Sequence, residues 1–552
     1  MWHRPFRAHA RRWLRQCAAA SRAARRIGPV GPAAAGLAAA AFALPRPAFA
    51  EPSGLAVRPP VAVEEDADMS NWSGTHQKKV RHVFSPDSMD QLWNVLQWAS
   101  ENRQKVRPVG MNLSPNGLAM DERGMMSMVE LDAIKGVDKE AGTITVQAGA
   151  RVSQILEELR KHGLTLENFS SITEQQIAGW TQVSAHGTGA RIPPVDEMIT
   201  SMEIACPGRG VLRLQDDVEP GLFRWLRVAL GTLGVVQELT LKVIPRYTLH
   251  ERTYCVTYDE LERHHKRLLQ TYRHVRYMWV PYTDTVVVVV SDVAEPGAEE
   301  NARPPLPEEQ RVEPLKALLR NLVPDCGDLE GKNFAQLRER LLELDPLNPK
   351  HVAQVNQAEA EFWKLSEGER VADSTAILGF ECGGAQWVLE NCFPCGTIDE
   401  PNLADIRYVK EMKEIIERKQ IAAASPIEQR WTSRSTSFLS PAYAAEEKAI
   451  FSWVGVIMYI TEKEEEAIRA KFREYAKEHV DLTFKYDGFF HWGKVDLKFH
   501  ESPAGKAALR AQLARKFDLR YFQKLKEKLD PANVLGNALT DFIYETEPGT
   551  RP

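Results

Sequence analysis

The sequence has few cysteines and no strong excess of charge of either sign. Its 552 residues include seven cysteines, at positions 17, 206, 255, 326, 382, 392 and 395, which are too sparse for the disulfide framework of a small secreted domain. Cys392 and Cys395 form a lone C-x-x-C. Because a four-ligand zinc site of this type needs a second pair, we expect two packed thiols there and no metal site. The formal net charge of −5 does not favour nucleic-acid binding, which requires a basic surface.

Acidic residues are absent from the first fifty positions, which contain nine arginines. An Arg-rich leader without acidic residues is typical of organelle targeting. The Ala-rich apolar run from Gly31 to Leu44 is followed by Ala48-Phe49-Ala50, and it is shorter than the roughly 20 residues that span a bilayer. Such a two-part leader predicts delivery to the mitochondrial intermembrane space. A thylakoid-lumen leader looks similar, and this segment does not separate the two.

After this leader, the sequence also lacks an apolar run long enough to cross a membrane. We therefore expect a mature protein that is soluble or peripheral on the inner membrane. Residues 51–70 are rich in Pro, Val and acidic residues and are predicted to form a linker. Hydrophobic residues make up 43% of the sequence and charged residues 26%, an ordinary globular composition. The chain is too long for a single core, so we expect more than one domain.

Helix and strand patterns alternate after the linker, which indicates an α+β fold. Asp87 or Ser88 can cap a helix within 84–99. The segment 151–162 is amphipathic and ends at Gly163. The other expected elements of this half are a strand over 143–148, a helix over 223–230 and a strand over 235–244.

The second half contains a strongly β-forming stretch, 277–290, with the sequence YMWVPYTDTVVVVV. This stretch is predicted to open a second, cap-like domain with an antiparallel sheet. Residues 295–313 are rich in Pro, Glu and Arg and are expected to form a solvated loop. Residues 315–370 are predicted to be rich in helices with charged, solvated faces.

Two loops rich in small and polar residues predict a ligand site. The stretch 106–117, VRPVGMNLSPNG, turns from apolar residues to Gly, Asn, Ser and Pro. Such a tight loop exposes backbone N–H groups that suit an anionic diphosphate. The stretch 168–191, NFSSITEQQIAGWTQVSAHGTGAR, is dense in small residues that let a flat ligand approach the backbone closely.

Together the two loops resemble the FAD-binding domain of the vanillyl-alcohol-oxidase family, in particular its aldonolactone branch. The resemblance runs from about Asn71 to about Asn537. It implies a two-lobed, PCMH-type FAD-binding domain over 71–246 and a cap or substrate domain with an antiparallel sheet and helices over 247–480. A C-terminal segment over 481–552 would return to the active site. The implied cofactor-binding residues are Val109, Gly110, Met111, Asn112, Leu113, Ser114, Pro115, Asn116, Gly117, Ser170, Ser171, Gln176, Gly179, Ser184, His186, Gly187, Thr188, Gly189, Val235 and Val236.

Leu113 stands where many members of this family have a histidine that carries a covalent bond to the flavin. Leucine has no nucleophilic nitrogen, so no covalent link can form at this residue. The plant-type dehydrogenases of the branch also have leucine here. The resemblance therefore implies FAD that is bound non-covalently.

Glu428 and Arg430 lie two positions apart in the stretch PIEQRWTSRS, 426–435. On a strand their side chains would project from the same face. A carboxylate and a guanidinium together can orient a polyol and stabilise developing negative charge, although the spacing alone fits an ordinary ion pair better. The resemblance favours catalysis, because the branch has E-x-R-W at this place. It implies that Glu428 binds the lactone hydroxyls and that Arg430 stabilises the enolate-like substrate and the reduced flavin.

Three weaker signals come from single residues or short segments. His491-Trp492-Gly493-Lys494 resembles the H-W-x-K segment that closes the active site in this branch, so His491 or Lys494 would polarise the lactone or face the flavin. Cys382 falls where plant-type members have a cysteine near the substrate, with a buried inert thiol as the alternative. His186 is predicted to be a cofactor-loop residue and not a base.

Ser170 departs from the pattern of the branch. The plant-type dehydrogenases have alanine at this position, which controls the access of oxygen to the flavin, and oxidases commonly have glycine. Serine is at least as large as alanine, so we expect Ser170 to act as an oxygen gate. The expected enzyme reacts slowly with oxygen.

The resemblance implies an FAD-dependent dehydrogenase that oxidises L-galactono-1,4-lactone to L-ascorbate and passes electrons to cytochrome c. One alternative is an aldonolactone oxidase that acts on L-gulono- or D-arabinono-1,4-lactone and reduces O₂ to H₂O₂. An alternative of another class is an assembly factor for respiratory complex I. The expected partners are thus an aldonolactone, cytochrome c and complex I assembly intermediates, in the intermembrane space or peripherally on the inner membrane of mitochondria.

Overall fold

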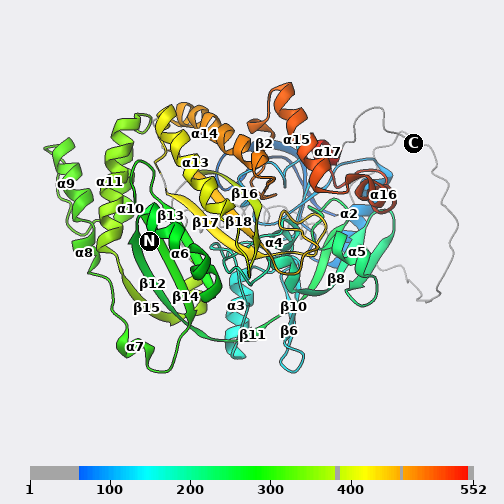
Figure 1. Ribbon diagram of the computed structural model, residues 1–552. Helices are drawn as coiled ribbons and strands as arrows, with labels where there is room; N and C mark the ends of the chain where they lie inside the picture. The colour runs from blue at the N-terminus through cyan, green and yellow to red at the C-terminus, as the bar shows by residue number, and fades with distance from the viewer. Residues whose placement is uncertain (1–60, 380–385, 425, 461–463, 545–552) are drawn as a thin grey trace.

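The computed structural model describes residues 61–379, 386–424, 426–460 and 464–544, in which the strands form four sheets. Figure 1 shows two lobes. The first lobe, which contains the earlier part of the chain, lies at the right, and the second lobe, here called the cap, lies at the left and centre. The predicted leader (1–50), the start of the predicted linker (51–60) and Cys382 lie outside the described residues. Within the described ranges, no helix combines the length and the apolar character needed to cross a membrane.

The first lobe contains a mixed four-stranded sheet and an antiparallel five-stranded sheet. The mixed sheet has the order β1-β2-β4-β3. Its strands are β1 (Val63–Ser70), β2 (Gln77–Phe84), β3 (Arg107–Val109) and β4 (Met125–Ser127). The five-stranded sheet has the order β5-β6-β10-β8-β9. Its strands are β5 (Ile134–Asp138), β6 (Thr143–Gln147), β8 (Ile199–Cys206), β9 (Gly210–Gln215) and β10 (Val235–Lys242).

Helices pack on these sheets, and their ends follow local capping rules. The Ser88 side chain accepts a hydrogen bond from the Gln91 N–H and thereby caps α2. A short pair, β7 (Leu164–Thr165) with β11 (Ile244–Pro245), completes the strands of this lobe. The helices are α2 (Met89–Glu101), α3 (Val152–Lys161), α4 (Ile177–Gln182), the 3-10 turn η1 (Val195–Met198) and α5 (Pro220–Leu226).

The cap is built on an antiparallel eight-stranded sheet of order β15-β12-β14-β13-β17-β18-β16-β19. Buried β-branched and aromatic residues fill its central strands, as expected for a sheet covered on both faces. The strands are β12 (Thr248–Val256), β13 (His274–Trp279), β14 (Val286–Val293), β15 (Gly368–Asp373), β16 (Gln386–Thr397), β17 (Ile427–Ser433), β18 (Ala449–Tyr459) and β19 (Phe489–Phe490).

Helices flank this sheet and continue to the end of the described chain. In Figure 1, α8 to α11 lie at one edge of the cap, and α15 to α17 lie near the first lobe. The cap helices are α6 (Tyr258–Thr271), α7 (Ala298–Asn301), α8 (Glu308–Arg311), α9 (Glu313–Leu322), α10 (Phe334–Leu342), α11 (Pro349–Leu365), α12 (Ser374–Leu378), α13 (Ala404–Lys419) and α14 (Glu465–Lys485). The last elements are η2 (Leu497–Phe499), α15 (Pro503–Lys516), α16 (Leu519–Leu529) and α17 (Ala538–Tyr544).

Several sequence-based element predictions differ from the structure. The end of the predicted linker forms β1, because Ala67 and Met69 are buried and the backbone pairs with β2. The helix predicted over 223–230 ends at Leu226, since the chain then turns through Leu230 and Gly231, both with positive φ. The loop predicted over 295–313 contains the short helices α7 and α8.

The stretch 277–290, predicted to be β-forming and to open the cap, is part of a hairpin. Strands β13 and β14 pair with each other around a turn in which Tyr282 has a φ of 63° and the Val280 N–H donates to the Thr285 carbonyl. Pro281 and Asp284 are common turn residues and explain the break. The first strand of the cap sheet is therefore β12, and not this stretch.

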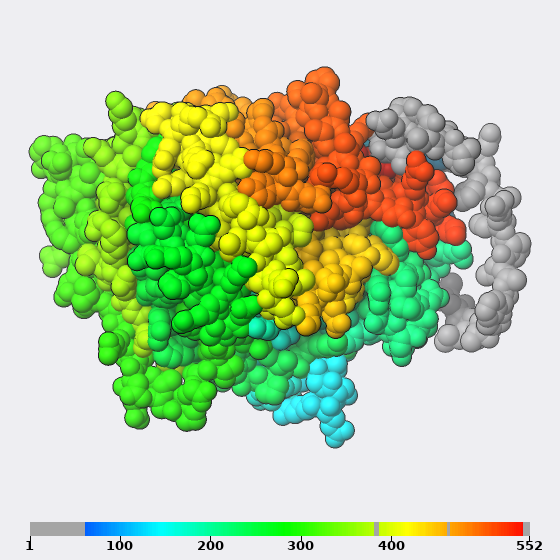
Figure 2. Space-filling model, in the orientation of Figure 1, coloured from blue at the N-terminus to red at the C-terminus, as the bar shows by residue number. Residues whose placement is uncertain are grey.

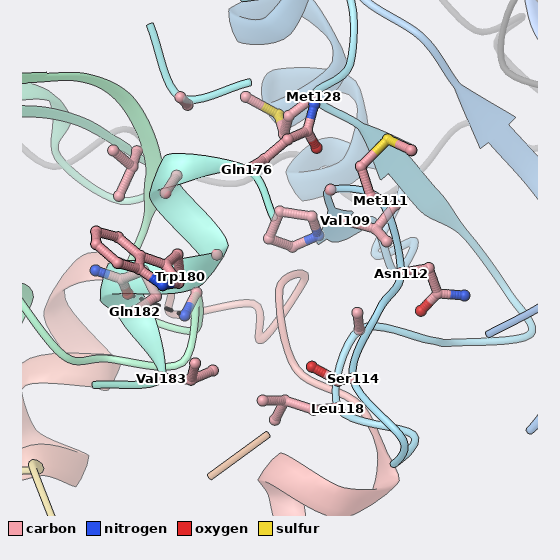
Figure 3. Close-up of a pocket in the computed structure, with 18 of the residues that line it drawn as sticks. Val109, Met111, Asn112, Ser114, Leu118, Met128, Gln176, Trp180, Gln182 and Val183 are labelled. Atoms are coloured by element: carbon pink, nitrogen blue, oxygen red, sulfur yellow. Dashed lines mark hydrogen bonds between the residues drawn. The ribbon is translucent and has the colours of Figure 1, made fainter. Parts of the chain in front are cut away.

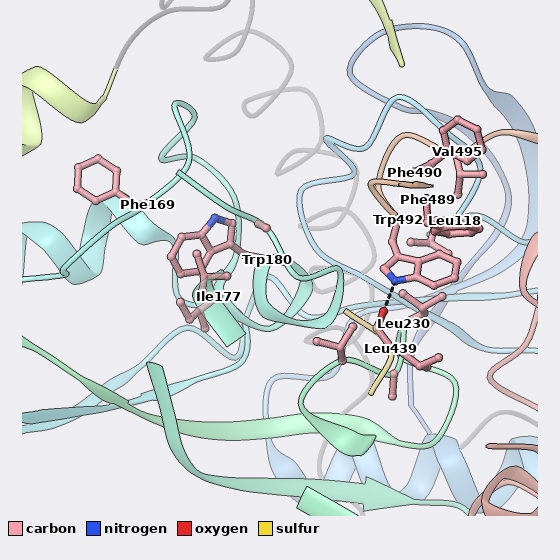
Figure 4. Packing of buried hydrophobic residues seen from close by; sticks show 14 of the residues in the cluster. Leu118, Phe169, Ile177, Trp180, Leu230, Leu439, Phe489, Phe490, Trp492 and Val495 are labelled. Carbon is pink, nitrogen blue, oxygen red and sulfur yellow. Dashed lines mark hydrogen bonds between the residues drawn. The ribbon is translucent and has the colours of Figure 1, made fainter. Parts of the chain in front are cut away.

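One large apolar core runs through both lobes, and a smaller core lies among α9, α10 and α11. Figure 4 shows how Trp492 joins distant segments, with Leu118 and Leu230 of the first lobe and Leu439 of the cap near its ring. The Trp492 indole N–H donates to the Leu439 carbonyl at 2.6 Å. On the face seen in Figure 2, the orange and red C-terminal part lies against both lobes.

The segment Gly187–Gly189 of the first lobe docks on the cap sheet. The Gly189 N–H donates to the Trp431 carbonyl at 2.7 Å, and Thr188 is hydrogen-bonded to the backbone of β13 through its hydroxyl. Gly189 has a φ of 146°, and a Cβ there would lie 2.9 Å from the Arg273 carbonyl oxygen. Only glycine fits this conformation and this close approach. The contact fixes the position of β17 relative to the first lobe.

A buried polar network holds the other face of β17. The Asp405 carboxylate accepts hydrogen bonds from the Trp431 indole at 2.7 Å and from His265 at 2.8 Å. His265 also bonds the Tyr277 hydroxyl. Burial alone would raise the pKa of Asp405, but its bonds to His265 and Trp431 lower it. Its contribution to stability is therefore fully present above its ordinary pKa and is lost as the pH falls through the folded-state pKa.

Replacing Asp405 by alanine is expected to lower the free energy of unfolding by about 3–5 kcal/mol, because it leaves the buried Nε2 of His265 and the buried indole N–H of Trp431 without their shared carboxylate partner. Urea unfolding followed by tryptophan fluorescence measures this change. The matched control is Asp399→Asn, which breaks an exposed ion pair with Lys448 and should leave the unfolding midpoint unchanged. Equal midpoints for both variants would contradict the assigned role of the network.

Candidate active site

The first lobe contains an open pocket, and the empty space of about 900 Å³ in and above it includes open solvent. Figure 3 shows two sides of the pocket. Val109 at the end of β3 and Ser114 in the loop after it lie on one side, and helix α4, with Trp180 and Gln182, lies on the other. Of the predicted cofactor residues, those that line the pocket are Val109, Gly110, Met111, Asn112, Leu113, Ser114, Gln176, Gly179, Val235 and Val236. The lining also includes Arg107, Leu118, Met128, Trp180, Gln182 and Leu230.

The loop approaches α4 closely because it contains glycine at the crossing point. A Cβ on Gly110 would lie 2.5 Å from Oε1 of Gln176. This oxygen and both polar side-chain atoms of Asn112 are buried and have no hydrogen-bond partner among the described residues. Buried polar atoms without a partner are expected where a polar ligand completes the bonding. The tight loop, the absence of a side chain at Gly110 and the buried polar atoms of Gln176 and Asn112 fit a flat, polar cofactor such as FAD.

The end of the same loop is bonded to the C-terminal part of the chain. The Asn116 side-chain amide donates to the carbonyls of Trp492 and Val495 at 2.8 and 2.7 Å. The carbonyl of Pro115 accepts from Thr75, and the carbonyl of Gly117 accepts from Asn537. These three predicted cofactor residues brace the loop, and none of them is part of the pocket lining.

Other predicted cofactor residues lie outside the pocket lining. Ser184 is buried and donates to Asp196 at 2.7 Å. Thr188 and Gly189 form the contact with the cap described above, and a Cβ on Gly187 would lie 2.0 Å from Oδ1 of Asn168 in the first lobe. Ser171 lies in the loop before α4. Their observed contacts are therefore with protein groups, at the joint between the lobes or near it.

Ser170 is half-buried, and its hydroxyl bonds to two residues of the pocket lining. It accepts from the Trp180 indole at 2.9 Å and donates to Oε1 of Gln175 at 2.6 Å. The hydroxyl is thus held by hydrogen bonds beside the pocket.

Glu428 and Arg430 project from one face of β17, as their spacing predicts. Glu428 lies opposite Gly455 of β18, and Gly455 lies opposite Glu390 of β16. These residues form one row across three strands, with side chains on the same face. The Arg430 guanidinium extends into this row: its Nη2 is 2.9 Å from Glu390 and 3.5 Å from Glu428.

Glu390 lies at the centre of a buried cluster of charged and aromatic side chains. Besides Arg430, it contacts Lys494 at 2.5 Å and Nε2 of His186 at 3.3 Å. Burial alone would raise the pKa of Glu390, but Lys494, His186 and Arg430 together lower it well below its ordinary value. Glu390 is therefore ionised at neutral pH and compensates the buried positive charge.

The two histidines of the cluster are neutral at neutral pH. Burial lowers the pKa of both His186 and His491, and the positive charges of Lys494 and Arg430 lower them further. His186 stacks on Trp453, with ring centroids 3.9 Å apart. Nδ1 of His491 accepts a hydrogen bond from the Gly493 N–H at 3.0 Å. Neutral His491 must then carry its proton on Nε2, so it offers a hydrogen-bond donor.

This cluster lies next to the pocket. A Cβ on Gly493 would lie 3.3 Å from Oγ of Ser114, which is part of the pocket lining. The structure thus brings together Glu428, Arg430, His491 and Lys494, which the sequence predicted as catalytic, and adds His186, which it predicted in the cofactor loop. The arrangement can bind hydroxyl groups through carboxylate oxygens and stabilise negative charge through two cations and an N–H donor.

Glu390 was not found from the sequence, because it belongs to no motif. A signal was present in the sequence around Glu390. This residue follows the apolar run Trp387-Val388-Leu389 in β16, and the residues around it in the strand are almost all buried. An ionisable residue within such a run is rarely buried unless it is paired. That pattern indicates a buried carboxylate with a function, but it does not identify its partners.

His186, Glu390 and His491 also have the spacing of metal ligands, with candidate ligand atoms within 4.8 Å of one another. Both oxygens of Glu390 are already paired with cations, Arg430 on one and Lys494 on the other. A metal ion would have to displace these contacts and remain near two positive charges. We therefore interpret the cluster as an ion-pair network.

The chain matches two family models, described as FAD binding domain over residues 80–214 and D-arabinono-1,4-lactone oxidase over residues 239–543. It is 41% identical over 495 residues to mitochondrial L-galactono-1,4-lactone dehydrogenase of Brassica oleracea, covering 86% of this chain and 82% of that protein. It is 23% identical over 490 residues to L-gulonolactone oxidase of Mus musculus, covering 86% and 97%. The solved structure of cholesterol oxidase from B. sterolicum has the same fold, with a TM-score of 0.70 at 16% identity over 90% of this chain and 99% of that one.

The lack of a nucleophile at Leu113 gives a direct test of how the flavin is held. Leu113 lines the pocket through an apolar side chain, so acid precipitation or heating should release all of the flavin into the supernatant. The absorbance of the supernatant and of the redissolved pellet measures the two fractions. Yellow colour that stays with the denatured protein would mean that another residue forms a covalent link.

Proposed function

This chain belongs to the D-arabinono-1,4-lactone oxidase family of FAD-dependent oxidoreductases, and from this premise we propose that it oxidises L-galactono-1,4-lactone to L-ascorbate. The observation that carries the proposal is the Arg430 guanidinium held between Glu390 and Glu428 beside the pocket. The plant relatives that bear this activity in their names are 41% identical over most of this chain, whereas the named gulonolactone oxidases are more distant.

Glu428 is the carboxylate of the cluster that is available to a substrate. Its side chain is 20% exposed, while that of Glu390 is 2% exposed. Its contact with Arg430 is long, at 3.5 Å, so its oxygens can accept hydrogen bonds from the lactone hydroxyls. Glu428 thus binds and orients the lactone.

Arg430 and Lys494 stabilise the negative charge that develops as the hydroxyl at C2 loses its proton and the product enolises. Both cations are held in place before the reaction by Glu390, so little reorganisation is needed when charge appears. The Nε2–H of His491 adds a neutral donor for the lactone carbonyl. When bound, FAD supplies the hydride acceptor.

The proposed electron acceptor is cytochrome c, and the proposed location is the mitochondrion, in the intermembrane space or peripherally on the inner membrane. The plant relatives are named as mitochondrial proteins. The position of Ser170 beside two residues of the pocket lining supports a restricted access of oxygen.

Two other functions are separated from this one by simple measurements. An aldonolactone oxidase would consume oxygen and release hydrogen peroxide with the lactone. A pure assembly factor for complex I would bind FAD but leave every lactone unchanged. The charged cluster beside the pocket favours catalysis over a purely structural role, because a buried group of this kind is costly to maintain.

Replacing Arg430 by lysine keeps the charge but removes the planar guanidinium that reaches both carboxylates. We expect turnover with L-galactono-1,4-lactone to fall by roughly 10²–10³-fold. Glu428→Gln should mainly raise the Michaelis constant, with a smaller or similar loss of rate. Steady-state reduction of cytochrome c measures both variants. Kinetics close to wild type in both would show that the two residues form only a structural ion pair.

Ser170→Gly should accelerate the reoxidation of the lactone-reduced enzyme by oxygen several-fold and leave reduction by the lactone nearly unchanged. Ser170→Ala is the matched control, because it loses the same hydrogen bonds to Trp180 and Gln175 but keeps the Cβ. Stopped-flow absorbance of the flavin measures each half-reaction. If the alanine and glycine variants react equally with oxygen, the side chain at this position does not limit access. Fast reoxidation of the wild type would assign the protein to the oxidases.

A further inference from the structure

Glu390 lies on β16 and contacts Arg430 on β17 and two loop residues, Lys494 and His186, while its own side chain is buried from solvent. One carboxylate oxygen accepts from Arg430 at 2.9 Å, and the other accepts from Lys494 at 2.5 Å and faces His186 at 3.3 Å. The residue is 1% exposed. Since both oxygens are used by protein cations, Glu390 cannot itself bind the lactone in this arrangement.

The backbone around Glu390 places these cations as well. The His491 N–H donates to the Glu390 carbonyl at 2.9 Å, and the chain turns so that the Lys494 N–H donates to the His491 carbonyl. Gly455 separates Glu390 from Glu428 in the row across the sheet. A Cβ on Gly455 would be 3.9 Å from Oε1 of Glu390, so the Glu390 carboxylate packs directly over this middle position of the row.

Arg430 therefore has two possible anionic partners on the same face of the sheet. It makes the shorter contact with the buried Glu390, and the longer one with Glu428. If Glu390 were uncharged, the guanidinium would be drawn towards Glu428, the nearest remaining carboxylate. Glu428 would then be held in a shorter ion pair and would offer fewer free oxygen lone pairs to the hydroxyl groups of a substrate. The Lys494 ammonium would also lose its only described carboxylate partner.

We propose that Glu390 is a positioning residue, which holds Arg430 away from Glu428 and fixes Lys494 beside it, so that one carboxylate and two cations face the lactone. This inference rests on the proposed function of Glu428 and Arg430. It predicts that the geometry of the carboxylate matters as well as its charge, because two separate oxygens make the two contacts.

The primary test compares Glu390→Gln and Glu390→Asp in the FAD-loaded protein. Glu390→Gln should lower the limiting rate of flavin reduction by L-galactono-1,4-lactone by roughly 10²-fold and also raise the lactone dissociation constant, since Arg430 then pairs with Glu428. Glu390→Asp keeps the charge but is one methylene shorter, so it should remain well below wild type. Recovery of wild-type rates in Glu390→Asp would overturn the proposal, because charge compensation alone would then suffice.

Glu359→Gln is the matched control for the loss of a buried carboxylate. Glu359 is also 1% exposed and pairs with an arginine, Arg338, in the helical part of the cap. It should lower the melting temperature about as much as Glu390→Gln does, but leave flavin reduction unchanged. A similar loss of reduction rate in the Glu359 variant would mean that general destabilisation explains the effect at Glu390.

A double-mutant cycle tests whether Glu390 acts through Arg430. In an Arg430→Lys background, Glu390→Gln should cost less rate than it does in the wild type, since the contact with Arg430 is already altered and only the contact with Lys494 remains to be lost. Independent losses that multiply would contradict the proposal. A crystal structure of Glu390→Gln gives a readout that needs no activity: Arg430 should be displaced towards Glu428. If wild-type protein oxidises no lactone but the displacement is seen, the proposed function fails and the positioning role stands; an unmoved Arg430 overturns that role.

Discussion

Two main-chain hydrogen bonds, from the Gly189 N–H to the Trp431 carbonyl and from the Ser433 N–H to the Ile192 carbonyl, join the first lobe to the strand that carries Glu428 and Arg430. This pairing forms because Gly189 adopts a φ of 146° and lies too close to the Arg273 carbonyl for any side chain. The pocket belongs to one lobe and most of the charged cluster to the other. Their mutual position, and therefore the site, depends on this constraint and on the bonds between Asn116 and the 492–495 segment.

The two faces of β17 perform different tasks with alternating residues. Gln429 and Trp431 are bonded within the core, to Trp279 and to Asp405. Glu428 and Arg430 face the opposite side, towards Glu390. Hydrogen bonds to neutral and charged groups thus fix one face of the strand, while the face with Glu428 and Arg430 carries an ion-pair network. Rigidity on one face is a physical requirement for preorganised charge on the other.

The sequence was sufficient to predict the fold class, the cofactor loop and the pair Glu428 and Arg430, because these depend on local composition or on a recognised motif. Ser88 as a helix cap and the strand over Ile427–Ser433 follow from the same local rules. Glu390 was missed because its meaning comes from strand register: it lies beside Gly455 and across from Glu428 only in the folded sheet. The strand β1 was also missed at the end of the predicted linker, since its pairing with β2 decided it.

The bonds at the end of the pocket loop have a consequence for the order in which the protein can mature. The Asn537 side chain donates to the carbonyls of Gly117, Leu118 and Met120, and Arg107 donates to the carbonyl of Leu535. These partners are separated by more than four hundred positions, with 420 between Asn537 and Gly117. During synthesis from the N-terminus, the loop is made early but its braces are made last. In a nascent or truncated chain the pocket loop therefore lacks these braces, which form only after the polypeptide is complete.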